Sequence, residues 1–202
     1  MNKIQKTILL GMILGDAYLQ KIGKRNARIR LEQSQKQQEY LLWKVGQFPE
    51  FFQGKPTVLS RYNALYGKTY RYIRWQSYAS PEIGAYQALF YRQGTKIIPE
   101  NLSDLLVDPR TIAVWYMDDG YLYHRDKMAY IYLPRYTEAD RERLHYVLKE
   151  NFQLQPSIKI KKKGNCVFVF SVRETKKLLT LIAPYIIPYF NYKLLDPVST
   201  EA

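Results

Sequence analysis

The chain has 202 residues, of which 47% are hydrophobic, and 31 lysines and arginines outnumber 18 aspartates and glutamates to leave a net charge of +13. This composition excludes a disordered chain, and the positive charge favours a polyanionic partner, either nucleic acid or an acidic membrane surface. The one cysteine, Cys166, excludes an internal disulfide and a cysteine-rich zinc site, and it is consistent with a reducing compartment.

The N-terminal segment carries Lys3 and Lys6 before the apolar run ILLGMIL (residues 8–14), which is a weak likeness to a secretory signal peptide. The run is short, Asp16 follows it and no cleavage site of small residues is present, so we expect no targeting signal. No stretch of the chain approaches the roughly 18 apolar residues that a membrane helix needs. We therefore expect an intracellular protein that makes no membrane contact.

The stretch GMILGDAYL (residues 11–19) predicts a helix that ends at Asp16. A carboxylate there is disfavoured by roughly 0.3–1 kcal/mol, because the C-terminus of a helix carries the negative end of its dipole. A bound cation would offset this cost. Gly11 and Gly15 are four residues apart, so they share a face of the helix and predict close approach by a neighbouring helix.

Two segments in the first half, residues 26–33 and 70–77, alternate polar with apolar side chains and predict strands. The second belongs to a predicted hairpin of residues 55–63 with 68–77. A two-stranded ribbon fits the major groove of DNA, where arginine reads guanine and glutamine reads adenine. The candidate DNA-binding residues of these segments are Arg28, Arg30, Arg61, Tyr72, Arg74 and Gln76.

A second apolar helix, IAVWYMDDG (residues 112–120), also ends in acid, at Asp119, and Asp108-Pro109 introduces it as N-cap and first helical residue. Beyond it, residues 128–135 are apolar on both faces, so their orientation stays unassigned. Residues 157–163 and 165–171 predict another hairpin, whose lysines suit phosphates rather than base edges. The candidate phosphate-binding residues are Lys159, Lys161 and Lys163.

An internal repeat relates the two halves of the chain. An offset of 103 residues carries Asp16 onto Asp119 and Ser34 onto Thr137. Ser34 and Thr137 each begin a predicted capping box, SQKQ and TEAD, ahead of a helical pattern. Each half then has a basic hairpin and a further helix, which is predicted to begin at Ser80-Pro81 in the first half and at the SVRE box of Ser171 in the second.

The repeat predicts an α/β (α+β) fold of two pseudo-twofold-related αββαββα halves, residues 1–100 and 101–202. In such a pair the two acid-tipped helices pack together and bring Asp16 and Asp119 side by side. Two neighbouring carboxylates cannot both stay ionised cheaply without a cation. Mg²⁺ prefers oxygen ligands and binds substrate phosphates, so it suits this pair.

The segments LLGMILGDA (residues 9–17) and IAVWYMDDG (residues 112–120) resemble the two signature motifs of the LAGLIDADG homing endonucleases, in particular the single-chain, two-motif type encoded within mobile introns. The resemblance implies that the two halves form a saddle with antiparallel DNA-binding sheets. It also implies an enzyme that makes a metal-dependent, staggered double-strand break in a long target in double-stranded DNA. Such a cut promotes the mobility of an intron or intein. A chain that carries both motifs is expected to act as a monomer.

The resemblance also implies the catalytic residues. The acid at the eighth position of each motif, here Asp16 and Asp119, binds Mg²⁺, and Mn²⁺ is expected to substitute for it. Lys96 and Lys193 correspond to the basic residues near the scissile phosphates. The second motif departs from the pattern, because Val114 and Asp118 stand where the first has glycines, and it therefore predicts an asymmetric helix contact.

Two alternatives use the same scaffold. An intron RNA maturase would keep the basic surface without needing either acid, so intron RNA is a possible further partner. A transcription factor derived from the same family would add a helix-turn-helix domain and lose its acids, and neither feature is seen in the sequence. For the enzyme we expect expression from an organellar genome, mitochondrial or chloroplast, or in the bacterial cytoplasm.

Overall fold

In the computed structural model, which describes residues 1–161 and 166–195, the chain divides into two units. Unit 1 comprises Met1–Gln5 and Asp16–Leu89, and unit 2 comprises Lys6–Gly15 and the chain from Phe90 onward. The division differs from the halves 1–100 and 101–202 that the repeat predicts, because unit 2 also includes residues 6–15, which contain most of the first motif, and residues 90–100. No helix within the described ranges is long and apolar enough to cross a membrane.

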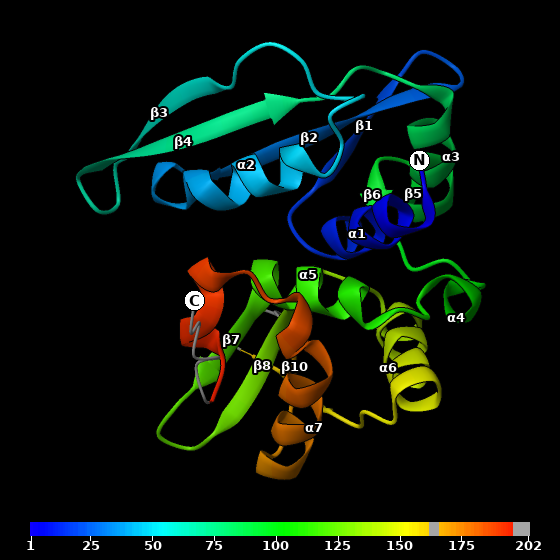
Figure 1. Cartoon of the computed structure of the whole chain (residues 1–202), viewed down its shortest axis with the longest axis vertical. Coiled ribbons are helices and arrows are strands. Elements are labelled where there is room, and N and C mark those ends of the chain that lie inside the picture. Colours follow the sequence, from blue (N-terminus) through cyan, green and yellow to red (C-terminus); the bar gives the residue numbers. More distant parts are fainter. Residues whose placement is uncertain (162–165, 196–202) are drawn as a thin grey trace. The chain divides into compact units, whose positions relative to one another are not determined.

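Unit 1 contains a four-stranded antiparallel sheet with the strand order β1-β2-β4-β3 (Figure 1). The predicted hairpin is confirmed as the pair β3 and β4. Helix α2, Gln38–Gly46, lies along one face of the sheet, and α3, Pro81–Phe90, follows β4. The strands are β1 Tyr18–Ile22, β2 Asn26–Ser34, β3 Thr57–Asn63 and β4 Lys68–Gln76.

The predicted alternation of β2 is confirmed. Ala27, Ile29 and Leu31 are buried, while the residues between them are exposed or half-buried. In β4, Ile73 is buried between the half-buried Tyr72 and Arg74. The apolar residues therefore make one face of the sheet part of the core, and the polar residues leave the other face open to solvent.

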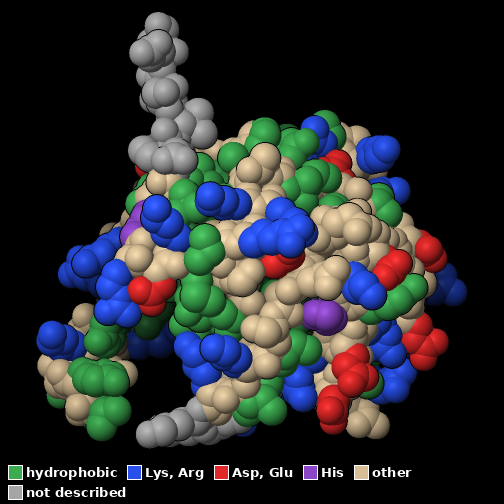
Figure 2. All heavy atoms as spheres, turned by 90° about the horizontal axis from the view of Figure 1, so that it is seen from below, with side chains coloured by type: hydrophobic (Ala, Val, Ile, Leu, Met, Phe, Trp, Pro, Cys, Tyr) green, Lys and Arg blue, Asp and Glu red, His purple; other side chains and the backbone are tan. Residues whose placement is uncertain are grey.

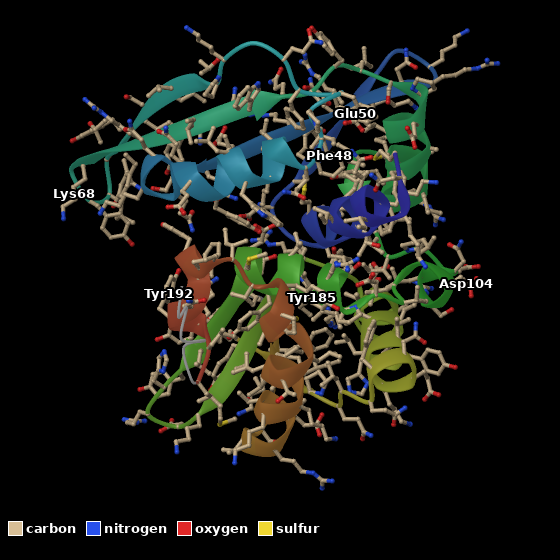
Figure 3. All side chains as sticks on the ribbon, viewed as in Figure 1. Phe48, Glu50, Lys68, Asp104, Tyr185 and Tyr192 are labelled. Atoms are coloured by element: carbon tan, nitrogen blue, oxygen red, sulfur yellow. The ribbon has the colours of Figure 1, made fainter. Side chains whose placement is uncertain are left out.

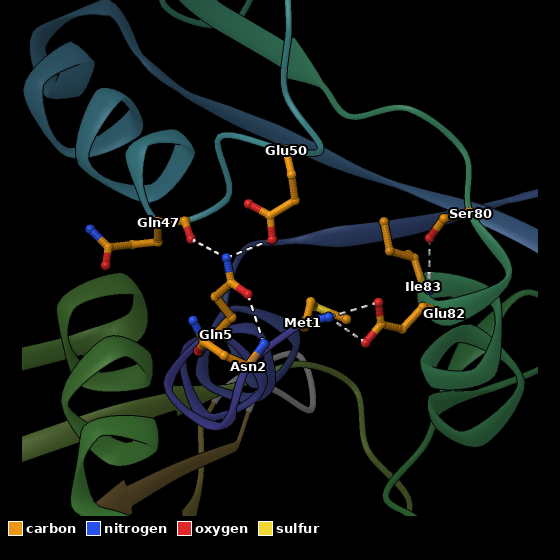
Figure 4. Close-up of polar contacts among 8 residues, drawn as sticks. All are labelled: Met1, Asn2, Gln5, Gln47, Glu50, Ser80, Glu82 and Ile83. Carbon is orange, nitrogen blue, oxygen red and sulfur yellow. Dashed lines mark hydrogen bonds and ion pairs between the residues drawn. The ribbon is translucent and has the colours of Figure 1, made fainter.

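The first five residues of the chain contact unit 1 (Figure 4). The amino group of Met1 lies 2.8 Å from a carboxylate oxygen of Glu82 in α3. The side-chain amide of Gln5 donates to the backbone oxygen of Gln47 at 3.0 Å and to Glu50 at 2.7 Å. Helix α1, Lys3–Leu14, thus begins in unit 1, and its residues from Lys6 onward belong to unit 2.

Unit 2 repeats the sheet topology of unit 1, with the antiparallel order β7-β8-β10-β9. In both sheets the strands follow the order first, second, fourth and third along the chain, which supports the internal repeat. Figure 1 shows α5 and α7 on one side of this sheet. The strands of this sheet are β7 Gly120–Tyr123, β8 Met128–Leu133, β9 Ser157–Ile160 and β10 Cys166–Val169. A separate two-stranded sheet pairs β5, Tyr91–Arg92, with β6, Thr95–Lys96.

The helices of unit 2 cover the apolar face of its sheet. Trp115 in α5 and His145 in α6 both make ring contacts with Phe168 of β10. The backbone amide of Ala129 in β8 donates to the hydroxyl of Thr175 in α7 at 2.8 Å. The helices are α4 Leu102–Leu105, α5 Pro109–Asp119, α6 Glu138–Phe152, α7 Val172–Ile182, and the 3₁₀ helices η3 Ala183–Tyr185 and η4 Pro188–Lys193.

Most of the predicted helix starts are confirmed. Asp108 caps α5 by accepting from the amide of Arg110, and Ser171 caps α7 by accepting from the amide of Glu174. Thr137 and Asp140 form both hydrogen bonds of a capping box at α6.

The predicted capping box at Ser34 is wrong, because its side chain makes no capping hydrogen bond. Ser34 is still part of β2, where it pairs with Tyr72, and the short 3₁₀ helix η1, Gln35–Gln37, separates it from α2. Strand pairing therefore determines where this helix begins.

Close packing of α1 on α5 within unit 2 confirms the prediction from the two glycines. A Cβ atom on Gly11 would lie 2.6 Å from the backbone oxygen of Thr111 and 2.7 Å from Cβ of Val114. A Cβ atom on Gly15 would lie 2.7 Å from Cβ of Asp118. The contact is asymmetric, as predicted, because α5 presents side chains where α1 presents none. The mixed helix and antiparallel sheet architecture agrees with the predicted fold class.

We expect Gly11→Val to lower the free energy of unfolding by about 1–3 kcal/mol, because the added atoms would overlap the backbone of α5, which cannot move aside easily. The matched control is Gly46→Val at the end of α2, where an added Cβ meets nothing within 4 Å. This control should change the free energy of unfolding by less than about 0.5 kcal/mol. Chemical denaturation of the two variants measures the difference, and equal midpoints would contradict the prediction.

Candidate active site and nucleic-acid interface

Asp16, the first predicted metal ligand, is exposed just beyond the end of α1 and belongs to unit 1. Its carboxylate accepts a hydrogen bond of 3.1 Å from the side-chain amide of Gln33 in β2. The sequence analysis missed Gln33. The sequence feature that could have identified Gln33 is a polar residue at a position that alternation places on the buried face of β2, together with Ala27, Ile29 and Leu31.

Asp119, the second predicted metal ligand, is the last residue of α5 and is half-buried in unit 2. Its negative charge affects Tyr136. Burial raises the pKa of the Tyr136 phenol, and the charge of Asp119 makes a smaller contribution in the same direction. Among the described residues, the Tyr136 hydroxyl has no hydrogen-bond partner, although its side chain is buried.

Each predicted catalytic lysine lies at the C-terminus of an acid-tipped helix within unit 2. The ammonium of Lys96 in β6 donates to the backbone oxygen of Gly15 at 2.9 Å. The ammonium of Lys193 in η4 donates to the backbone oxygen of Met117 at 2.8 Å. A cation in this position stabilises a helix by about 0.3–1 kcal/mol. The two lysines therefore offset the unfavourable position of an acid at each helix end.

Lys193 is held firmly against α5. It is 8% exposed, and the hydroxyl of Tyr116 donates to its backbone oxygen at 3.0 Å. Its ammonium lies 4.8 Å from the centre of the Phe190 ring. Burial raises the pKa of Tyr116, so this phenol stays protonated as a donor. The ammonium of Lys193 therefore binds the backbone of Met117, which lies two residues before Asp119 in α5.

The predicted metal ligands fit a hard divalent cation in their chemistry. Both are carboxylates, which are the oxygen donors that Mg²⁺ prefers. The described residues contain no group of three or more histidine, cysteine, aspartate or glutamate side chains that could hold a metal ion. A site of the zinc type, complete within one cluster, is therefore not present in the described part of the chain.

The six predicted DNA-binding residues of the first half lie on one face of the sheet in unit 1, which we call the arginine face. Residues paired across an antiparallel ladder point to the same side. Arg30 pairs with Gln76, Glu32 pairs with Arg74, and Leu59 pairs with Tyr72. Alternation along β2 and β3 adds Arg28 and Arg61. Lys68 lies at the tip of the β3–β4 hairpin (Figure 3).

Glu32 lies at the centre of the arginine face. Arg74 donates to its carboxylate at 2.6 and 2.8 Å, and Arg61 reaches it at 2.6 Å. A nitrogen of Arg30 lies 3.7 Å away. Partial burial acts to raise the pKa of Glu32, but the hydrogen bonds and charges of Arg61 and Arg74 outweigh it and hold that pKa below its usual range. The sequence analysis did not foresee this network.

The open face of the sheet in unit 2, which we call the tyrosine face, has a different character. The register pairs Tyr121 with Tyr130, and Val167 with both Tyr132 and Lys159. It assigns the orientation of β8 that the sequence left open. The ammonium of Lys161 donates to the hydroxyl of Tyr132 at 3.0 Å and lies over its ring. Lys163 lies outside the described residues.

Basic side chains are common on the surface of the chain, as Figure 2 shows for one face. Together with the arginine face and the tyrosine face, they provide the cationic and aromatic groups that bind nucleic acids. Amide and guanidinium groups can read base edges, whereas lysine and tyrosine hydroxyls bind phosphates.

Comparisons with known proteins identify the family of the chain. The family model described as the LAGLIDADG DNA endonuclease family matches residues 6–178. The probable intron-encoded endonuclease 1 of Wickerhamomyces canadensis is 31% identical over 96% of this chain and 85% of that protein.

Two solved structures are similar. The homing endonuclease I-WcaI bound to its DNA recognition sequence has a TM-score of 0.87 at 29% identity and covers 98% of this chain and 88% of its own. The structure of I-DmoI in complex with DNA and Mn has a TM-score of 0.50 at 19% identity over 88% of this chain and 95% of its own, which shows the fold alone. By sequence and fold, the chain belongs to the LAGLIDADG DNA endonuclease family and is a DNA endonuclease of the homing type.

Proposed function

We propose that the chain makes a staggered double-strand break in a long target in double-stranded DNA, and so promotes the mobility of an intron or intein. The observation that carries this proposal is a feature that the two acid-tipped helices share. A lysine ammonium binds a backbone oxygen near the C-terminus of each helix, at Gly15 just after α1 and at Met117 in α5. Asp16 directly follows Gly15, and Asp119 lies two residues after Met117. Two such groups suit an enzyme that cuts two strands.

We assign Asp16 and Asp119 as the ligands of Mg²⁺, which Mn²⁺ can replace. When bound, a divalent cation of this kind lowers the pKa of a water molecule and stabilises the charge that develops on the phosphate. Gln33 orients the carboxylate of Asp16 through the hydrogen bond between them. The packing of Gly15 against Asp118 supports the assignment, because each of these two residues is followed directly by one of the proposed ligands.

Lys96 and Lys193 carry the positive charge of the site. Their ammonium groups offset the negative charge that accumulates on the phosphate during cleavage, or they order the attacking water. Backbone carbonyl oxygens hold both ammonium groups in position, so little reorganisation is needed when the DNA binds.

The two open sheet faces are the proposed DNA-binding surfaces. The arginine face offers guanidinium and amide groups for base edges, and the tyrosine face offers lysines and hydroxyls for phosphates. We also propose that the chain acts as a monomer and works in a reducing compartment, organellar or bacterial, which suits a chain whose one cysteine, Cys166, is buried and forms no disulfide. Binding of intron RNA stays a prediction that the same surfaces permit.

The first test separates catalysis from binding. Asp16→Asn and Asp119→Asn keep the shape of each side chain but remove the charge that holds the metal, so either change should abolish double-strand cleavage. Binding should survive, because counterion release by basic side chains dominates affinity. Cleavage of a plasmid that carries the uninterrupted insertion site, together with gel-shift binding, measures both effects.

The control for this test is Asp104→Asn, the same chemical change at an exposed residue of α4 (Figure 3). It should cleave at the wild-type rate. Wild-type cleavage by Asp16→Asn or Asp119→Asn would refute the assignment of that aspartate. Thermal melting without metal shows whether each variant is folded, and we expect no loss of stability.

The second test concerns the cation. Mg²⁺ or Mn²⁺ should support cleavage, while Ca²⁺ should support binding with little or no cutting, because carboxylate oxygens bind all three ions but only the first two suit the chemistry. Cleavage in each ion after dialysis against EDTA provides the measurement. Undiminished cutting in excess EDTA would show that no divalent cation is needed.

The third test concerns base readout. Arg74→Ala and Gln76→Ala should each weaken discrimination at particular base pairs by about 1–3 kcal/mol, the value of a good bidentate contact. Lys161→Ala should instead weaken binding to every sequence alike and reduce the slope of log affinity against log salt concentration by about one. Competition binding with single-base variants of the target distinguishes the two patterns. Unchanged base preferences in both Arg74→Ala and Gln76→Ala would contradict the assigned role of the arginine face.

A further inference from the structure

An acid occupies the middle of a surface that should attract DNA. Glu32 is the only acidic residue in β1–β4, and it lies on the arginine face, where its charge opposes the approach of a polyanion. Its cost to sequence-independent affinity therefore needs a compensating benefit, and its contacts indicate what that benefit is.

Both carboxylate oxygens of Glu32 are engaged by arginines. Oε1 accepts from Arg61, and Oε2 accepts from two nitrogens of Arg74, Nε and Nη2. The carboxylate is only 22% exposed. With its acceptors occupied in this way, Glu32 is poorly placed to bind the exocyclic amine of a cytosine itself.

The arginines, in contrast, keep donors to spare. A guanidinium has five N–H groups, and Arg74 uses Nε and one hydrogen of Nη2 on Glu32. The Nη1–Nη2 edge remains, and this edge can bind O6 and N7 of guanine together. Arg74 also lines a pocket of about 240 Å³ with Lys55 and Gln76, so there is room beside it for a nucleotide group.

Fixing these side chains has an energetic consequence. A free arginine has many rotamers, and ordering them on binding weakens a specific contact. Arg61 is held on two sides, because its guanidinium also lies 4.7 Å from the centre of the Tyr72 ring. A preorganised arginine binds the base that matches its geometry, and it does not readily change rotamer to accommodate a different base.

We propose that Glu32 is a positioning residue that fixes Arg30, Arg61 and Arg74 for base readout, so that unit 1 gives up sequence-independent affinity in exchange for specificity. The inference rests on the proposed DNA-binding role of the arginine face and extends it. It predicts that affinity for non-specific DNA and discrimination between sequences change in opposite directions when the carboxylate is neutralised.

The principal variant is Glu32→Gln, which keeps the size of the side chain and removes its charge. Non-specific duplex should bind about 3- to 10-fold more tightly, because one negative charge leaves the surface that faces the phosphates. Discrimination should fall about 5- to 100-fold, because the arginines are no longer held by a carboxylate. A role confined to folding would instead lower both quantities.

Glu32→Asp separates position from charge. The charge is kept, but the carboxylate retreats by one methylene and can no longer reach all three arginines. Discrimination should fall while affinity for non-specific duplex stays within about twofold of wild type. The matched control is Glu39→Gln, which makes the same charge change at an exposed residue of α2 and should leave discrimination unaltered.

The probe is a duplex library with a randomised central segment, bound in Ca²⁺, selected and sequenced for each variant. Fluorescence anisotropy then gives the ratio of affinities for the most enriched duplex and a scrambled one. Far-UV circular dichroism checks folding. We expect the base preferences of one half-site to flatten at several positions in Glu32→Gln and Glu32→Asp.

Three outcomes would overturn the inference. Full discrimination by a folded Glu32→Gln or Glu32→Asp would show that the arginines need no fixing. Loss of preference at a single C·G pair would show that Glu32 reads a base directly. Failure of the wild-type chain to enrich any duplex would refute the proposed function itself, and this result is distinct from the other two.

Discussion

The close approach of α1 to α5 is the constraint on which the proposed active site depends. Gly11 and Gly15 present no side chain to α5 within unit 2, and the space that a Cβ would take is filled by the backbone of Thr111 and the side chain of Val114 at Gly11, and by the side chain of Asp118 at Gly15. Apolar residues around both glycines are fully buried, so the contact is also part of the core. Asp16 lies just beyond the end of α1 and Asp119 is the last residue of α5, so each acid is close in sequence to this helix contact.

Electrostatics then makes an unfavourable arrangement tolerable. An acid at a helix C-terminus meets the negative end of the dipole, and two such acids occur at equivalent places in the repeat. Lys96 and Lys193 bring compensating charge by binding the terminal carbonyl groups directly. The same cations are suited to act on a phosphate, so in the proposed mechanism one pair of side chains serves both the stability of the helix ends and the chemistry of cleavage.

The two sheets share one topology but present different chemistry. The arginine face concentrates guanidinium groups around Glu32, whereas the tyrosine face carries phenols and lysines. Duplication of a scaffold thus leaves each copy free to diverge at the side chains that point away from the core. A target contacted by such a chain need not be palindromic, because the two proposed DNA-binding surfaces are not equivalent.

The sequence by itself determined the local features: the alternation of β2 and β4, the acid-tipped helices, the glycine pair, the caps at Asp108, Thr137 and Ser171, and the repeat. The repeat follows from comparing the two halves of the chain, and the other features depend on periodicity and on neighbours a few residues apart. Only the tertiary structure decided that Gln33 binds Asp16, that β2 runs on through Ser34, that three arginines converge on Glu32, and that residues 6–15 pack into unit 2. Each of these depends on strand register or on packing between distant segments, which a local pattern does not encode.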